Sequence, residues 1–167
     1  WSAACSTGQE AYSMALTLLE CAGNKSVDWR ILGTDISTDA LRVASSGIFP
    51  KTETNRIPQE FLAKYFVKKD EENEHRIHPQ IRKHVSFNRL NLAATPFVMK
   101  GPFDVIFCCN VMIYFDEPII HRLIQELHRL LRPNGLLMVG QAERLPDKYQ
   151  KHFHNVHPSI YERRPSP

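Results

Sequence analysis

Three stretches of the chain carry apolar residues at the spacing of an amphipathic helix. They run from Glu10 to Cys21, from Ser37 to Ser45 and from Pro118 to Leu131. The apolar positions of the last stretch are Ile119, Leu123, Ile124, Leu127, Leu130 and Leu131. We expect Ser37 or Thr38 to cap the second helix, because a hydroxyl at that position can accept a hydrogen bond from the first turn.

Shorter apolar runs between these helices predict strands. They span Trp29 to Thr34, Val85 to Leu90, Asp104 to Cys109 and Leu136 to Gly140, and we expect the third run to be fully buried. Alternation of strands and helices is typical of an α/β fold in which right-handed crossovers connect a mostly parallel sheet. The pattern therefore predicts that fold class.

The stretch from Lys51 to His84 interrupts this alternation. It is densely charged between Lys68 and Arg76 and has no glycine there, whereas Ile57 to Phe66 could form one helix. Composition alone favours a solvated loop or a small hairpin insert over a specific binding surface.

Composition describes a globular protein of ordinary size. The chain has 167 residues, of which 43% are hydrophobic and 23% charged, and its net charge is +3. This length suits one domain, and neither a membrane-spanning apolar run nor a signal-peptide pattern is present. Because the first residue is Trp, inside an expected strand end, we expect the chain to be an N-terminally truncated piece of a longer protein. The mild charge does not predict nucleic-acid binding.

The cysteines and histidines predict no metal or redox chemistry. Cys5, Cys21 and the vicinal pair Cys108-Cys109 lack CxxC spacing, which favours reduced, structural thiols and a cytoplasmic location. The eight histidines include His152, His154 and His157 in a polar segment, so we expect surface histidines there and no metal site.

Small or polar residues gather at three expected strand ends. They are the turn before Glu10, the acid Asp35 and the amide Asn110. In an open α/β sheet, such ends converge on the crevice where ligands bind. The first turn has only Gly8 and lacks the G-x-G-x-x-G pattern, so pyrophosphate binding is disfavoured and a plain strand–helix connection is equally compatible.

Asp35 and Asn110 each allow two interpretations. Asp35 could accept hydrogen bonds from the hydroxyls of a ribose, as in Rossmann-type sites, or it could cap the following helix. Asn110 follows a very apolar strand, where its amide needs partners. That amide could satisfy the local backbone or face a ligand.

At these positions the chain resembles the CheR-type chemotaxis receptor methyltransferases. The matching stretches are Trp1 to Ser13, Gly33 to Ile36, Asn91-Leu92, Asn110 to Asp116, Leu131 to Leu137 and Gly140 to Glu143. They cover essentially the whole chain, as the family's C-terminal catalytic domain. The resemblance implies a Rossmann-like class I fold for methyltransferases dependent on S-adenosylmethionine (SAM). That fold has a mostly parallel twisted sheet with helices on both faces and a small inserted β-subdomain, here at residues 51–84.

The resemblance also implies a reaction and its partners. It implies methyl transfer from SAM to glutamate carboxylates on the cytoplasmic helices of chemoreceptors, which yields γ-glutamyl methyl esters and S-adenosylhomocysteine. A non-catalytic or SAM-sensing signalling module is the alternative. Methylation of nucleic-acid bases is disfavoured, because Asn110-Val-Met-Ile stands where an Asn/Asp-Pro-Pro-aromatic turn would be needed. Neither nucleic acid nor membrane insertion is expected.

Seven residues match functional positions of the family. Six of them are implied to bind the cofactor: Glu10, Asp35, Asn91, Leu92, Asn110 and Val111. Glu10 would contact its amino-acid part, Asp35 its ribose, the next pair its adenine, and the last pair the region near its methionine end. Tyr114 would face the substrate, with a core aromatic as the alternative.

The chain differs from the family pattern in several places. Gln9 and Ala11 replace a Glu and a Pro, Cys109 replaces an Arg, and Gly140-Gln-Ala-Glu143 replaces Gly-His-Ser-Glu. Some members grip a receptor C-terminal pentapeptide with a glycine-bearing loop in the inserted subdomain. Because Lys68 to Arg76 has no glycine, we expect no such tether. The family's N-terminal domain lies outside the chain, so we expect weakened cofactor binding.

Overall fold

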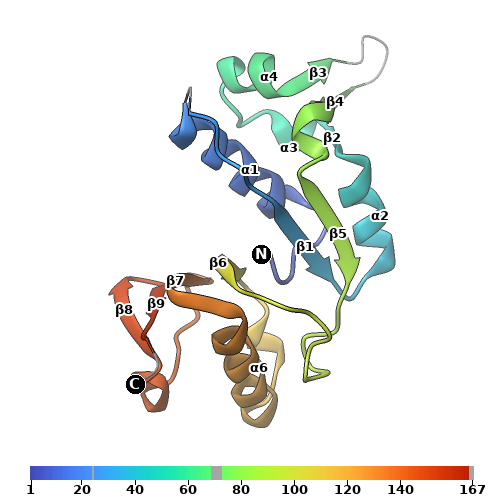
Figure 1. The fold of residues 1–167 in the computed structure, drawn as a ribbon. Helices are drawn as coiled ribbons and strands as arrows, with labels where there is room; N and C mark the ends of the chain where they lie inside the picture. The colour runs from blue at the N-terminus through green and yellow to red at the C-terminus, as the bar shows by residue number, and fades with distance from the viewer. Residues whose placement is uncertain (24, 69–72, 166–167) are drawn as a thin grey trace. The chain divides into compact units, whose positions relative to one another are not determined.

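The computed structural model describes residues 1–23, 25–68 and 73–165. The chain divides into two compact units, each of which is described by itself. The first unit is Cys5–Arg89, and the second unit is Trp1–Ala4 together with Leu90–Pro167. Figure 1 shows the elements of both.

The first unit is built on two parallel strands. Strand β1 (Ile31–Asp35) pairs with β5 (Val85–Arg89), and Gly33 lies opposite Phe87. Helices α1 (Gln9–Ala22) and α2 (Thr38–Ser46) both contact this pair (Figure 1). These elements confirm the predicted strands and helices to within about two residues at each end.

The ends of α2 follow the sequence. The Ser37 side chain accepts a hydrogen bond of 3.2 Å from the backbone N–H of Ala40, so Ser37 is the N-cap. Gly47 ends the helix in the left-handed region, at φ 60°, where a glycine has no Cβ to clash.

The described residues of the segment that follows form a subdomain of the first unit. Its antiparallel sheet has the order β2 (Ile48–Pro50), β4 (Glu74–Ile77), β3 (Phe66–Lys68). The short helices α3 (Lys51–Thr54), α4 (Gln59–Tyr65) and α5 (Pro79–Arg82) accompany it. Its buried side chains include Phe49, Leu62, Tyr65, Phe66, Ile77 and Ile81. The solvated-loop interpretation is therefore wrong, because apolar residues scattered between the charges meet in one core; the bounds 51–84 remain a prediction.

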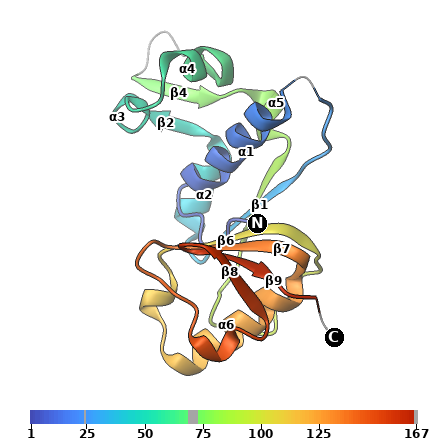
Figure 2. The same ribbon diagram turned by 90° about the vertical axis from the view of Figure 1, so that its left-hand side faces the viewer.

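The second unit contains a parallel strand–helix–strand unit followed by a hairpin. Strand β6 (Phe103–Cys108) leads through α6 (Glu117–Leu130) to β7 (Leu131–Val139). Strands β8 (Phe153–His157) and β9 (Ile160–Arg163) then complete a sheet of order β6-β7-β9-β8. Figure 2 shows α6 alongside this sheet.

The core of the second unit lies between α6 and the sheet. Leu123, Ile124, Leu127 and Leu130 of α6 are each at most 1% exposed, as are Ile106, Leu131 and Leu137. The expectation that 104–109 is fully buried is wrong. Asp104 is exposed and pairs with Arg132 at 2.9 Å, whereas only Ile106 and Cys108 of β6 are fully buried. Ile106 and Cys108 share one face of β6, because alternating strand residues point to opposite faces, whereas Val105 and Phe107 on the other face are only half-buried.

Residues near the N-terminus extend the sheet of the second unit. Ser2 forms a parallel bridge with Phe107. The Phe107 N–H donates to the Trp1 carbonyl at 2.7 Å, and the Ala3 N–H donates to the Phe107 carbonyl at 2.8 Å. The expected placement of Trp1 at a strand end agrees with this pairing.

Candidate functional site

A tight turn precedes α1 in the first unit. The Cys5 N–H donates to the Thr34 carbonyl at 2.8 Å, and Ser6 and Gly8 have positive φ values of 47° and 96°. A Cβ on Gly8 would lie 2.9 Å from the Cβ of Ala44, so only glycine fits here. Gly8 is the N-cap of α1 and has no side chain that could accept a hydrogen bond from the first turn.

Asp35 lies at the end of β1, beside this turn. One carboxylate oxygen accepts the Ser6 N–H at 2.8 Å, and the other accepts the Ser37 N–H at 2.9 Å. Ser37 itself caps α2, so the interpretation of Asp35 as the helix cap is wrong. The two backbone donors fix the orientation of the carboxylate, and each oxygen keeps a further lone pair for another donor.

Glu10 is a half-buried residue in the first turn of α1. The charges of Glu10 and Asp35 both act on the thiol of Cys5. Burial is the main cause that raises the pKa of Cys5 to about 12, followed by Asp35, with Glu10 contributing least. Cys5 is therefore protonated at neutral pH and is no nucleophile. The first unit thus brings together two of the predicted cofactor residues, around a small-residue turn.

Asn91 and Leu92 lie near the start of Leu90–Pro167, the longer segment of the second unit. Asn91 is exposed, and its side-chain oxygen accepts the Ala93 N–H at 3.0 Å, which forms a local turn. Leu92 is only 5% exposed. The pair therefore combines a fixed polar residue with an apolar anchor.

Asn110 and Val111 follow β6 in the second unit. Asn110 has a φ of 56°, in the left-handed region that asparagine tolerates better than most residues. The backbone N–H groups of Asn110 and Val111 donate to Glu143, at 2.8 and 3.0 Å. The Asn110 side chain is exposed, so it does not fill the core at the strand end.

Tyr114 ends the short 3₁₀ helix η1 (Met112–Tyr114). Its side chain is 78% exposed in the structure, and the preceding Ile113 is 60% exposed. The alternative interpretation of Tyr114 as a core aromatic is therefore wrong. Tyr114 belongs to the same unit as Asn91, Leu92, Asn110 and Val111.

Glu143 is the residue whose importance sequence reasoning missed. Its carboxylate is held by backbone groups of the segment that contains Asn110 and Val111, although it lies more than thirty positions later in the chain. The Gly140-Gln-Ala-Glu143 stretch carried the only sequence signal, as a family match with no role attached to it.

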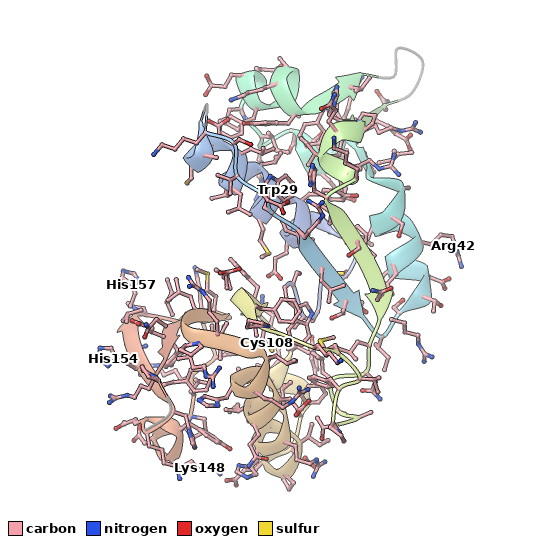
Figure 3. The ribbon with its side chains drawn as sticks, viewed as in Figure 1. Trp29, Arg42, Cys108, Lys148, His154 and His157 are labelled. Carbon is pink, nitrogen blue, oxygen red and sulfur yellow. The ribbon has the colours of Figure 1, made fainter. Side chains whose placement is uncertain are left out.

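A cavity of about 340 Å³ lies in the second unit. It is lined by residues of the 141–150 loop, including Glu143, and of the β8–β9 hairpin, but by none of the seven predicted residues. His154 and His157 are exposed on β8 (Figure 3). Within residues 1–23, 25–68 and 73–165, no cluster of His, Cys, Asp or Glu could hold a metal ion. No helix in the same ranges is long and apolar enough to span a membrane.

Curated proteins that are similar to the chain are chemotaxis protein methyltransferases. A chemotaxis protein methyltransferase of Escherichia coli (strain K12) is 39% identical over 145 residues, which are 86% of this chain and 51% of that protein. A probable chemotaxis protein methyltransferase of Rhizobium etli is 36% identical over 165 residues, 96% of this chain and 61% of that protein. The chain thus spans about half the length of the first curated relatives it matches.

A solved structure supports the fold. The TehB-like SAM-dependent methyltransferase from Corynebacterium glutamicum aligns with a TM-score of 0.53 at 13% identity, over 97% of this chain and 76% of that one. The chain therefore has the Rossmann-like fold of SAM-dependent methyltransferases, as predicted. The model of the CheR methyltransferase SAM-binding domain matches residues 1–161, and the chain belongs to that family.

Proposed function

We propose that the chain is the catalytic domain of an enzyme that transfers a methyl group from SAM to glutamate side chains of chemoreceptors. The observation that carries this proposal is the family match over residues 1–161, together with relatives named chemotaxis protein methyltransferase. The products would be γ-glutamyl methyl esters and S-adenosylhomocysteine.

The residues of the first unit fit a cationic nucleoside cofactor. The carboxylate of Asp35 is fixed by two backbone donors and keeps lone pairs for two ribose hydroxyls. Glu10 supplies a second negative charge, which suits the ammonium group of the cofactor's amino-acid part. The N-terminus of α1, which begins after Gly8, suits the adjoining carboxylate.

The residues of the second unit match the remaining cofactor positions of the family. Asn91 is exposed and would offer its carboxamide beside the adenine, and the buried Leu92 would anchor the chain there. Asn110 and Val111 would line the methionine end of the cofactor. Their support is the match to the family motif and, for Asn110, an exposed side chain on a fixed backbone.

The chemistry requires little from the protein beyond binding and orientation. A glutamate side chain titrates near pH 4.3, so the substrate carboxylate is already a nucleophile at neutral pH and no general base is needed. When bound, SAM supplies a sulfonium methyl group that a carboxylate oxygen can attack, with S-adenosylhomocysteine as the leaving group. Tyr114 would orient that carboxylate with its hydroxyl, and proximity would supply most of the acceleration.

The test uses the chain alone and inside a relative. In a chimera, this chain replaces the matched half of the E. coli methyltransferase. Calorimetry measures the binding of SAM and S-adenosylhomocysteine, and a radiolabelled methyl group measures transfer to receptor cytoplasmic fragments. We expect base-labile methyl esters on receptor glutamates. A folded chimera that binds SAM without methylating receptors would support a SAM-sensing module instead, and no SAM binding by either protein would refute the proposal.

We further propose that the chain binds no tethering peptide of a receptor. It rests on the lack of glycine between Lys68 and Arg76, although residues 69–72 of this loop lie outside the described residues. Titration with a receptor C-terminal pentapeptide should give no detectable heat. Tight binding of that peptide would contradict the proposal.

A further inference from the structure

We propose that Glu143 is a positioning residue for the methyl-transfer site, acting through the backbone of Asn110 to Met112. The inference rests on the proposed function, because it explains how residues assigned to cofactor and substrate are held. Nothing in the motif comparison gave Glu143 a role. Its backbone partners, which are Asn110, Val111, Met112 and Gly140, all lie within the second unit.

The carboxylate of Glu143 accepts four backbone hydrogen bonds. One oxygen accepts from the N–H groups of Val111 at 3.0 Å and Met112 at 2.8 Å. The other accepts from the N–H groups of Asn110 at 2.8 Å and Gly140 at 2.7 Å. Three of the four donors are consecutive, so a single side chain fixes the whole turn that follows β6.

The side chain of Glu143 matches this set of contacts in its number of acceptors. Glu143 is 5% exposed, and its two oxygens together provide acceptors for four donors. The isosteric amide of glutamine would turn an NH₂ group toward two of the N–H groups, which would leave those two without an acceptor. Hydrogen bonds to a charged acceptor are stronger than neutral ones, so the anchor is stiff.

Gly140 makes this geometry possible. It follows β7, and a Cβ there would lie 2.5 Å from the side-chain oxygen of Asn110 and 2.7 Å from an oxygen of Glu143. Because β6 and β7 are parallel, Asn110 and Gly140 both follow the carboxyl ends of neighbouring strands. The glycine lets the Glu143 carboxylate reach between these ends.

The residues that we assign to the methyl-transfer end of the site lie in this anchored turn (Asn110 and Val111) or shortly after it (Tyr114). The turn holds Asn110 at its positive φ of 56°. It also sets the start of η1, in which the Tyr114 N–H donates to the Val111 carbonyl at 3.1 Å. A displaced Glu143 would therefore disturb Asn110, Val111 and Tyr114 together, although it is assigned no contact with cofactor or substrate.

Glu143→Gln tests the role, with Glu126→Gln as matched control. Glu126 is a second buried carboxylate of the same unit, 8% exposed, and it accepts the Phe97 N–H at 2.8 Å away from the turn after β6. Gly140→Ala displaces the carboxylate without changing a charge. All variants are made in this chain and in the chimera described above, and circular dichroism verifies that each is folded.

Two measurements distinguish positioning from general stability. Amide hydrogen exchange in the unliganded chain should accelerate at least about tenfold at residues 110, 111, 112 and 140 in Glu143→Gln, because the affected N–H groups lose a charged acceptor. The Kd for SAM should rise and kcat should fall by at least about tenfold in Glu143→Gln and in Gly140→Ala. Glu126→Gln should change exchange in this turn, Kd and kcat by less than about threefold, because it leaves the turn intact.

The outcomes separate this inference from the proposed function. Faster exchange with unchanged Kd and kcat would reduce Glu143 to a structural residue and overturn the inference. Equal losses of activity in Glu143→Gln and Glu126→Gln would overturn it as well. If the unsubstituted chain and chimera bind no SAM, the proposed function fails, whereas unchanged exchange in Glu143→Gln would refute the anchor itself.

Discussion

Replacement of Asp35 by alanine should abolish most of the cofactor affinity while changing stability little. The two backbone bonds that the carboxylate accepts, from Ser6 and Ser37, lie at the surface, where water can replace it. We therefore expect the free energy of unfolding to fall by about 1 kcal/mol. The two proposed ribose hydroxyls would lose a charged acceptor worth about 1.5 kcal/mol or more each, so the Kd for SAM should rise at least about a hundredfold.

Calorimetric titration of SAM measures the affinity, and urea unfolding measures the stability. The control is Asp39→Ala, which removes a carboxylate of α2 that is 82% exposed and pairs with Arg42 at 2.8 Å. Such surface pairs contribute little, so the control should retain both affinity and stability. The ribose assignment is refuted if Asp35→Ala binds SAM within threefold of the parent chain, or if Asp39→Ala loses as much affinity.

Three further predictions concern stability. In Gly33→Ala, the new Cβ would lie 2.6 Å from two ring carbons of Phe87, so urea unfolding should show a loss of about 1–3 kcal/mol; an unchanged midpoint would contradict this packing. Leu127→Ala, at a position that is 0% exposed, should lower the free energy of unfolding by about 2–5 kcal/mol in the same assay. Val98→Ala, at a fully exposed position, should lower it by under about 0.5 kcal/mol. Similar losses in the two variants would contradict the burial of Leu127 in the core. Burial lowers the pKa of His128 from 6.5 to about 4. As the pH falls, His128 therefore takes up a proton in the unfolded chain before it does so in the folded chain. Stability should therefore fall as the pH drops from 6.5 toward 4, and His128→Phe should reduce this slope; parallel curves for both proteins would refute it.

Strong periodicity made the central elements predictable from the sequence. The six apolar positions predicted for α6 lie on one stripe. Five of them are buried or half-buried in that helix, and the sixth, Leu131, is the buried first residue of β7. Strands β8 and β9 were missed, because β8 buries only Phe153 and its other residues are polar or exposed. The family resemblance implied an inserted β-subdomain, but the apolar pattern did not locate its strands, since each has only three or four residues among charged neighbours.

The sequence predicts only those site residues whose side chains carry chemistry that a motif comparison can recognise. Asp35 and Tyr114 are two of them. Ser37 could be expected as a cap because its partner, the Ala40 N–H, is local. Glu143 could not be found this way, because its partners are backbone N–H groups, which every residue except proline possesses. Only the register of β6 against β7 brings those groups to one carboxylate.

The pairing of Trp1–Ala4 with β6 has a consequence for the order in which the chain folds during synthesis. The first unit is continuous, so its contacts can form once Arg89 has left the ribosome. Trp1 to Ala3 must wait for Val105 and Phe107, more than one hundred residues later, before their backbone groups are paired. Closing so long a loop is slow compared with local contacts. We therefore expect this N-terminal stretch to be protected late, after the elements that follow it in the sequence.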